Sequence, residues 1–178
     1  MTTKNRWLSV LVVAVIVAAV SLISAGRGQA VAFSPTLGHR APLFTLKSLA
    51  GQSVSLSQFA GKLVFVNFFA SWCPPCQAET PDLVKMYKQY GSRVQFIGVD
   101  LTSSDTEADV RKFVARYGIT YPVLLDQEGA VAQSYQVLGI PTSLFIDRSG
   151  VIVAKAEGGM SSALMQKDFS QLVNRPVA

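Results

Sequence analysis

Apolar runs and amphipathic stretches alternate along most of the chain. The runs Leu63–Phe69, Val94–Val99 and Tyr121–Asp126 are apolar on nearly every position, which is typical of strands covered on both faces. After the first two runs, and again near the C-terminus, apolar residues recur at i, i+3, i+4 and i+7 spacing or close to it, which predicts helices. The residues of these three apolar helix faces are Leu83, Met86, Tyr87 and Tyr90; Val110, Phe113, Val114 and Tyr117; and Met165, Phe169, Leu172 and Val173.

Shorter strands flank this alternation. We expect Ala41–Leu46 to form an edge strand, which Gly51 turns towards a second strand at Ser53–Leu56. Strands Ser143–Asp147 and Val151–Ala156 are joined by a tight turn. Single helical segments are expected at Ser57–Ala60 and Ala130–Tyr135. Strands that alternate with helices and end in a hairpin and a helix predict an α/β sandwich with a mixed central β-sheet.

Polar residues and glycines mark the ends of these helices. Ser104 and Glu107 have the spacing of a capping box, in which each side chain bonds to the backbone N–H of the other residue. Gly91 and Gly118 follow the last apolar positions of the first two helices and are expected to end them.

The N-terminus has a different pattern. Trp7 to Ala25 is a stretch of nineteen residues without charge, and at ~1.5 Å per residue a helix of this length crosses a hydrocarbon core of ~30 Å. Lys4 and Arg6 precede it, so the positive-inside rule places the rest of the chain outside the cytoplasm, although Arg27 opposes this orientation. We expect residues 1–25 to be a cytoplasmic start and membrane anchor, residues 26–36 a tether, and residues 37–178 the folded domain.

Two other interpretations fit this segment less well. The first is a helix of a globular domain, but such a helix normally has a polar face towards solvent, which this stretch lacks. A cleaved signal peptide fits the small residues in 28–32, but its apolar region is normally shorter, about 7 to 15 residues. If the segment is cleaved, the domain is secreted or periplasmic rather than held at the cell membrane.

Composition narrows the function classes. With 49% hydrophobic and 15% charged residues, the domain can bury a sizeable core, and disorder is excluded. The formal net charge is +5, but the basic residues are scattered rather than clustered in a run. We therefore expect no nucleic acid partner and interpret the charge as a weak preference for anionic surfaces, with a membrane as the nearest candidate.

The chemistry is concentrated in Trp72-Cys73-Pro74-Pro75-Cys76, which holds the only two cysteines of the chain. The motif joins the run Leu63–Phe69 to the first helix, so Cys73 lies at a helix N-terminus, where unpaired N–H groups and the helix dipole favour a thiolate. A nucleophilic thiol with a second thiol in reach is a redox device. A purely structural disulfide would close a loop too short to constrain the unfolded chain much.

Metal binding is the other alternative for the cysteine pair. Two cysteines and one histidine, His39, cannot complete four zinc ligands without acidic residues or a partner. We expect neither a metal site nor a cofactor.

Several motifs together resemble a known family. Val66 to Cys76, Pro81 five residues later, and Gly139-Ile140-Pro141-Thr142 before a strand hairpin are similar to the thioredoxin superfamily. The N-terminal strands, Gly61-Lys62, Glu79 and an extra helix and strand between about Thr102 and Asp126 resemble its membrane-anchored redoxins of the ResA and TlpA type. The resemblance implies a thioredoxin-like fold with an N-terminal β-hairpin and a central helix–strand insert.

The resemblance also implies roles for individual residues. Cys73 would attack a substrate disulfide and Cys76 would resolve the mixed disulfide, leaving the redox-active disulfide Cys73–Cys76. From the sequence alone, Pro141 is either an ordinary loop residue or a cis-proline; the resemblance implies a cis-proline opposite the cysteines. It further implies that Ile140 offers backbone groups to the substrate. The remaining residues expected to shape the site are Trp72, Pro74 and Pro75.

Proton handling depends on two further positions. Thioredoxin has a buried aspartate six residues before its first cysteine, whereas this chain has Asn67, which cannot titrate. Glu79 lies three residues after Cys76 on nearly the same helix face. By itself Glu79 also fits a solvated helix charge, but the resemblance implies that it handles the proton of Cys76. Three polar residues near strand ends receive no role: Asp100, Tyr121 and Asp126.

The expected function is a thiol-disulfide oxidoreductase that reduces protein disulfides outside the cytoplasm. The resemblance suggests Cys-x-x-Cys-His segments of apocytochrome c as substrates and a membrane thiol-reducing protein as electron donor. Reduction of other envelope proteins, including those of spore assembly, is equally open. We expect the chain to be a monomer. A disulfide-forming oxidant stays open, because sequence does not set the redox potential. Thiol peroxidases have a threonine where this chain has Ala70, and thioredoxin-fold copper chaperones have a different cysteine spacing and a later histidine, which this chain lacks after His39.

Overall fold

The computed structural model describes residues 35–176 of the chain. The predicted membrane anchor, residues 1–25, lies outside the described residues, as does the predicted tether up to residue 34. Within residues 35–176, none of the helices has both the length and the hydrophobicity of a membrane span.

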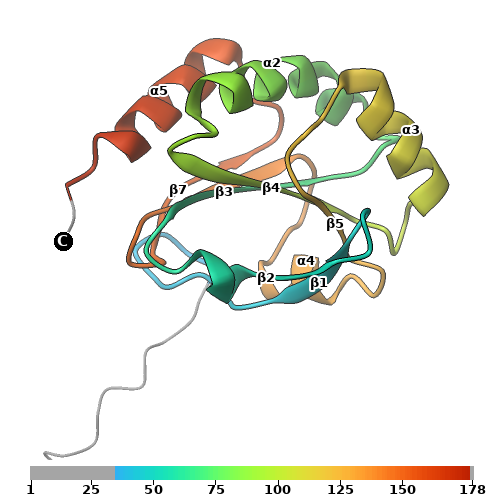
Figure 1. Ribbon diagram of the computed structural model, residues 1–178, viewed down its shortest axis with the longest axis horizontal. Coiled ribbons are helices and arrows are strands. Elements are labelled where there is room, and N and C mark those ends of the chain that lie inside the picture. Colours follow the sequence, from blue (N-terminus) through green and yellow to red (C-terminus); the bar gives the residue numbers. More distant parts are fainter. Residues whose placement is uncertain (1–34, 177–178) are drawn as a thin grey trace, which may run out of the picture. The chain divides into compact units, whose positions relative to one another are not determined.

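A seven-stranded mixed sheet forms the centre of the domain (Figure 1). Its strand order is β2-β1-β5-β4-β3-β6-β7, in which β3, β4 and β5 run parallel and the other neighbours are antiparallel. The strands are β1 (Thr45–Ser48), β2 (Ser53–Ser55), β3 (Leu63–Phe69), β4 (Val94–Asp100), β5 (Val123–Leu125), β6 (Thr142–Ile146) and β7 (Ile152–Glu157). The mixed sheet confirms the predicted fold class.

Helices cover both faces of this sheet. The elements are η1 (Leu56–Phe59), α2 (Pro74–Tyr90), α3 (Glu107–Tyr117), α4 (Ala130–Ser134) and α5 (Ser162–Val173). Helices α2, α3 and α5 lie on one face, and α4 lies on the other (Figure 1). This arrangement buries β3 on both sides, which explains its continuous apolar sequence.

Alternation along β3 assigns each side chain to one of the two cores. Phe65 and Phe69 pack in the core beneath α2, α3 and α5, whereas Val66 and Phe68 pack in the core on the α4 side. Asn67 therefore faces α2, the helix that begins with the cysteines. The single polar residue of the strand is thus directed to the chemical site rather than to solvent.

A row of aromatic rings anchors helix α5 to the sheet. Phe65 is in register with Phe96 of β4 and Phe145 of β6. The ring of Phe169 lies over this row, with centroids 4.9 Å from Phe65, 4.9 Å from Phe96 and 5.0 Å from Phe145. Such contacts between buried rings stabilise the packing beyond the area that they remove from water.

The first strand differs from its prediction. It spans Thr45–Ser48 rather than Ala41–Leu46, and it is not an edge strand, because β2 and β5 flank it on either side. The preceding residues pair elsewhere: the N–H of Gly38 donates to the carbonyl oxygen of Ile152, and the N–H of Ala41 donates to that of Gly150. The backbone there belongs beside the β6–β7 hairpin.

The predicted capping box at Ser104 and Glu107 is also wrong. The N-cap of α3 is Thr106, whose Oγ1 accepts from the N–H of Asp109 at 3.1 Å. The carbonyl oxygen of Ser104 instead accepts a bond from the indole of Trp72. Ser104 is held by the cysteine loop and lies two residues before the N-cap.

Candidate active site

The two cysteines form a disulfide bond at the start of α2, and their Cα atoms are 5.3 Å apart. Cys73 is the N-cap of the helix, and its Sγ accepts from the N–H of Cys76 at 3.3 Å. Pro74 and Pro75 occupy the first helical positions, where a missing N–H leaves no bond unmade. In the reduced state, the Cys76 N–H and the helix dipole would stabilise a thiolate on Cys73.

A loop from the far end of the sequence lies against the cysteines. The peptide bond between Ile140 and Pro141 is cis, as the resemblance implied. The carbonyl oxygen of Ile140 is 3.7 Å from Cys73 Sγ. On the other side of this loop, the N–H of Gly158 donates to the carbonyl oxygen of Pro141 at 2.8 Å. The fold therefore brings Ile140, which is 67 residues away in sequence, beside the sulfur of Cys73.

Two exposed apolar side chains lie close in sequence to residues of the site, while the disulfide itself is covered. Cys73 and Cys76 are only 2% and 1% exposed, but Trp72 is 55% exposed and Leu138 is 93% exposed. Trp72 directly precedes Cys73, and Leu138 lies two residues before Ile140. Leu138 was not singled out from the sequence, because a lone leucine before a glycine carries no signal. Together these side chains offer apolar contacts to a partner at Cys73.

The start of the helix–strand insert holds the cysteine loop. The indole Nε1–H of Trp72 donates to the carbonyl oxygen of Ser104 at 2.9 Å. The carboxylate of Asp105 accepts from the Ser71 N–H at 2.6 Å and from the Ser71 hydroxyl at 2.9 Å. The residues just before Cys73 are therefore positioned by side-chain contacts across 34 residues of sequence.

Glu79 is not a solvated helix charge, because it is only 4% exposed. Its Oε1 accepts from the side-chain amide of Asn67 at 3.0 Å, and its Oε2 accepts from the N–H of Met160 at 3.0 Å. Asn67 also donates to the hydroxyl of Ser143 at 3.0 Å. Burial raises the pKa of Glu79, and the bonds from Met160 and Asn67 offset part of that rise.

The phenol of Tyr121 lies near this carboxyl group. Burial raises the pKa of Tyr121 well above its ordinary value, and the negative charge of Glu79 adds to the rise. Tyr121 therefore stays protonated and neutral beside Glu79, and burial is what disfavours the ionised form of Glu79. The two residues form a buried environment in which Glu79 can hold a proton.

Asp100 is a second buried carboxyl group near the cysteine loop. It is fully buried at the end of β4, in register with Phe69 of β3. Its Oδ1 accepts from the hydroxyl of Thr102 at 2.8 Å, whereas Oδ2 is the one buried side-chain oxygen or nitrogen in residues 35–176 without a hydrogen-bond partner. Burial, with the charge and hydrogen bonding of Asp105, raises the pKa of Asp100 to about 8.

A proton on Asp100 accounts for this arrangement. A protonated carboxyl group donates one hydrogen bond, and Asp105 is the carboxylate whose hydrogen bonding favours the protonated form of Asp100. Asp105 in turn accepts both bonds from Ser71. From the sequence, Asp100 was given no role and Asp105 was not recognised. The available signal was a polar residue at the carboxyl end of a strand parallel to β3.

The structure brings the predicted site residues into one region. Cys73, Cys76, Trp72, Pro74 and Pro75 occupy the start of α2 and the residue before it, and Ile140 contacts Cys73. Glu79 lies one turn further along α2. Within the described part of the chain, no group of three or more Cys, His, Asp or Glu side chains is arranged to bind a metal ion.

A disulfide between two cysteines at a helix N-terminus, with a cis-proline loop beside it, defines the class of thioredoxin-like dithiol–disulfide proteins. The chain belongs to the AhpC/TSA family, whose model matches residues 37–155. Its similarity to ResA proteins, described below, makes it a thiol-disulfide oxidoreductase of the ResA type, and Cys73–Cys76 is its redox-active pair.

Known relatives match most of the chain. The thioredoxin-like protein YneN of Bacillus subtilis is 38% identical over 131 residues, which is 73% of this chain and 76% of that protein. The thiol-disulfide oxidoreductase ResA of Halalkalibacterium halodurans is 32% identical and is matched over 96% of both chains. The thioredoxin domain of a thiol-disulfide oxidoreductase from Bacteroides vulgatus is 31% identical, with a TM-score of 0.70 over 78% of this chain and 99% of that chain.

Proposed function

We propose that the chain is a membrane-anchored oxidoreductase that reduces protein disulfides outside the cytoplasm. The observation that carries the proposal is the setting of Cys73, whose sulfur accepts from the N–H of Cys76 at a helix start and lies beside the carbonyl oxygen of Ile140. This setting favours a nucleophilic thiolate and leaves a peptide backbone group next to it for an extended substrate.

The reaction transfers two electrons to the substrate. The Cys73 thiolate attacks one sulfur of the substrate disulfide, and the other substrate sulfur leaves as a thiolate. Cys76 then loses its proton and attacks Cys73 Sγ, which releases the first substrate sulfur as a thiolate. The substrate has gained two electrons from the two cysteines, and its two thiolates take up protons from solvent or side chains. Cys73 and Cys76 are left joined by a disulfide.

Location outside the cytoplasm rests on the N-terminal pattern. The nineteen uncharged residues from Trp7 to Ala25 follow Lys4 and Arg6, which supports an anchor with a cytoplasmic start. In an oxidising compartment, the Cys73–Cys76 pair needs a supply of electrons to stay reduced. A membrane protein that delivers thiol reducing equivalents is the electron donor we propose.

The exposed apolar residues at the site support a peptide substrate. Trp72 precedes Cys73, Leu138 lies two residues before Ile140, and both side chains are exposed, while the carbonyl oxygen of Ile140 lies beside Cys73. An unfolded segment with two close cysteines can lie along such a surface. We propose the Cys-x-x-Cys-His segment of apocytochrome c as the substrate, which follows from the resemblance to ResA-type proteins.

The reduced chain is expected to reduce a disulfide-bonded Cys-x-x-Cys-His peptide and to become oxidised at Cys73–Cys76. Equilibration of the chain in thiol–disulfide buffers of known potential gives the reduction potential of the Cys73–Cys76 pair. A potential near about −270 mV supports a reductant, whereas one near about −120 mV contradicts it and supports a disulfide-forming oxidant. Insulin serves as an unrelated disulfide substrate: equal rates on insulin and the peptide would contradict the substrate proposal while leaving reductase activity in place.

Glu79→Gln tests the proposed transfer of the Cys76 proton. Because the amide cannot titrate, the second step, attack of Cys76 on Cys73, is expected to slow roughly tenfold or more near neutral pH. Its rate should also lose the part of its pH dependence that belongs to Glu79. The measurement is stopped-flow decay of a mixed disulfide on Cys73 between pH 5 and 9.

The matched control for that experiment is Glu128→Gln, which removes an exposed carboxylate. It is expected to leave the rate and the pH profile unchanged. An unaltered pH profile in Glu79→Gln would remove Glu79 from the mechanism. A flattened profile would support its role even if the variant were less stable, because lower stability alone does not flatten a titration.

A further inference from the structure

Five exposed cations gather at the end of the domain opposite the cysteines. We call this surface the basic end, and its cations are Arg40, Lys62, Arg93, Arg148 and Arg175. Three adjoining hollows there share Gly61 and Arg148 in their lining. The cations come from five separate segments, so the sequence shows only scattered charges, whereas the fold brings them to one surface.

The basic end carries little negative charge. Among the described residues that line the three hollows, Asp147 is the one acidic side chain. Its Oδ1 accepts from the N–H groups of Ser149 and Val151, and its Oδ2 lies 3.6 Å from Nε of Arg175. This carboxylate is engaged within the β6–β7 hairpin and compensates at most one of the five cations.

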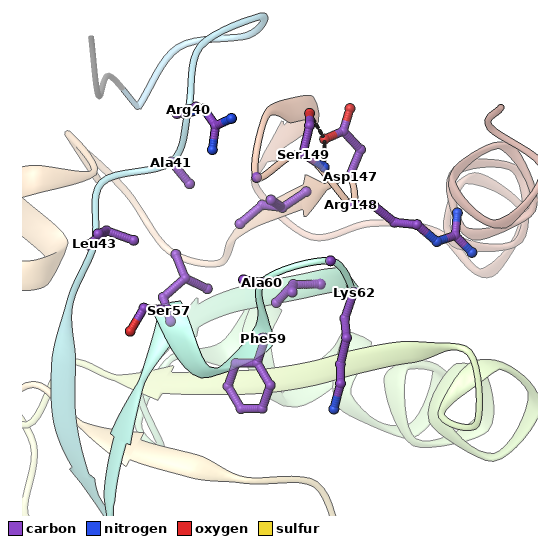
Figure 2. A pocket seen from close by; sticks show the side chains of 15 residues that line it. Arg40, Ala41, Leu43, Ser57, Phe59, Ala60, Lys62, Asp147, Arg148 and Ser149 are labelled. Atoms are coloured by element: carbon purple, nitrogen blue, oxygen red, sulfur yellow. Dashed lines mark hydrogen bonds between the residues drawn. The ribbon is translucent and has the colours of Figure 1, made fainter. Parts of the chain in front are cut away.

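The largest of the three openings combines apolar walls with a cationic rim (Figure 2). It has a volume of about 340 Å³. Its apolar lining includes Ala41, Leu43 and Phe59, and Arg40 and Arg148 line it from different segments (Figure 2). Cations around an apolar hollow match a surface of negatively charged groups attached to hydrocarbon chains.

Strand β3 separates this surface from the chemistry. The strand begins at Leu63, which lines two of the hollows, and ends at Phe69, four residues before Cys73. Seven residues at ~3.3 Å each span roughly 20 Å. Contacts at the basic end therefore leave the cysteines free to meet a substrate.

The chain enters the domain at the basic end. The first described residues pair with the β6–β7 hairpin there, through bonds from Gly38 to Ile152 and from Ala41 to Gly150. Residues 26–37 lie between the proposed anchor and Gly38. Twelve residues reach at most about 43 Å even when fully extended. The basic end thus stays close to the surface of the membrane to which the chain is attached.

We propose that the basic end docks on an anionic phospholipid membrane, the same membrane that holds the proposed anchor, and so presents Cys73 on the side of the domain that faces away from the lipid. The proposal rests on the membrane attachment proposed above. Charge attraction to lipid phosphates acts within a Debye length of about 8 Å at physiological salt, and the linker allows the cations to come within that range.

Hydrogen exchange of the full chain in lipid vesicles tests this docking. We compare vesicles of phosphatidylcholine with vesicles that also contain phosphatidylglycerol. Amides in residues 38–41, 59–63, 91–95 and 147–150 are expected to exchange at least about threefold more slowly on the anionic vesicles, whereas amides in 71–77 exchange equally on both. Raising the salt to about 0.5 M is expected to remove the difference.

Two charge-matched triple variants isolate the basic end. Lys62→Gln/Arg93→Gln/Arg148→Gln is expected to lose the slower exchange on anionic vesicles. The control Lys85→Gln/Lys112→Gln/Arg116→Gln removes the same charge from α2 and α3 and is expected to keep it. Equal exchange on both lipids, or equal behaviour of the two variants, would overturn the proposal. The salt comparison on the unaltered chain decides the matter if a variant does not fold.

Attachment and docking fail in different ways. If the unaltered chain does not bind neutral vesicles, the proposed anchor is wrong. The docking proposal then predicts that the chain still binds anionic vesicles through the basic end. Loss of retention there as well would overturn the docking proposal. Firm attachment to both vesicles without a difference in exchange would overturn docking alone.

Discussion

Replacement of Cys73 by serine is expected to lower the rate of disulfide reduction by at least about a thousandfold. The serine hydroxyl stays protonated in a setting that stabilises a thiolate, because its pKa lies far above that of a thiol even with the N–H of Cys76 directed at it. The measurement is the rate of insulin reduction with dithiothreitol as the electron source.

Cys76→Ser is the matched variant, because it also removes one sulfur and the disulfide. It is expected to keep the first attack and to stop at a mixed disulfide between Cys73 and the substrate, which non-reducing gels and mass spectrometry detect. Turnover that survives Cys73→Ser, or mixed disulfides that form in Cys73→Ser but not in Cys76→Ser, would reverse the assigned order of attack. Far-UV circular dichroism shows whether both variants remain folded.

Asp100→Asn is expected to raise stability at neutral pH and to remove a large pH dependence. The pKa of Asp100 rises from its ordinary value of 3.8 to about 8 on folding, mainly through burial. The folded chain therefore keeps the proton up to about pH 8, whereas the unfolded chain loses it near pH 4. The stability that this group contributes is fully present below about pH 4 and falls by about 1.4 kcal/mol per pH unit until about pH 8.

Asparagine has the shape of the protonated acid and can donate to Asp105 at every pH. The quantity to measure is the difference in free energy of unfolding between Asp100→Asn and the unaltered chain, from urea titrations between pH 4 and 8. This difference should grow in favour of the variant as the pH rises. The control Asp82→Asn changes a surface carboxylate that pairs with Lys85, and surface pairs of this kind contribute little. Parallel stability curves for Asp100→Asn and the unaltered chain would contradict a buried, protonated Asp100.

The central strands and helices were predictable because each has a local signal. The bounds of β3 match the predicted run Leu63–Phe69, since seven buried residues in succession fit few other settings. Helix α3 ends before Gly118, whose φ of 64° suits glycine. The first strand and the start of α3 were wrong because their competing signals are tertiary: backbone pairing with the β6–β7 hairpin in one case, and the bond from Trp72 to Ser104 in the other.

The sequence by itself determined the reactive pair and its local setting. Two cysteines separated by two prolines, at the junction of a buried strand and a helix, predict a thiolate at a helix start, and the structure places Cys73 at the N-cap. That prediction needs only residues adjacent in the chain, because a helix end is a local feature.

Only the tertiary structure decided what surrounds that pair. Cys73 meets Ile140 across 67 residues, Ser71 meets Asp105 across 34, and Glu79 meets the backbone of Met160 across 81. The same holds for the five cations of the basic end, which no run of sequence brings together. Strand pairing in the sheet and the packing of helices onto it set these distances. The burial and raised pKa values of Glu79 and Asp100 therefore follow from the fold rather than from neighbours in the sequence, and so does the charge of the basic end.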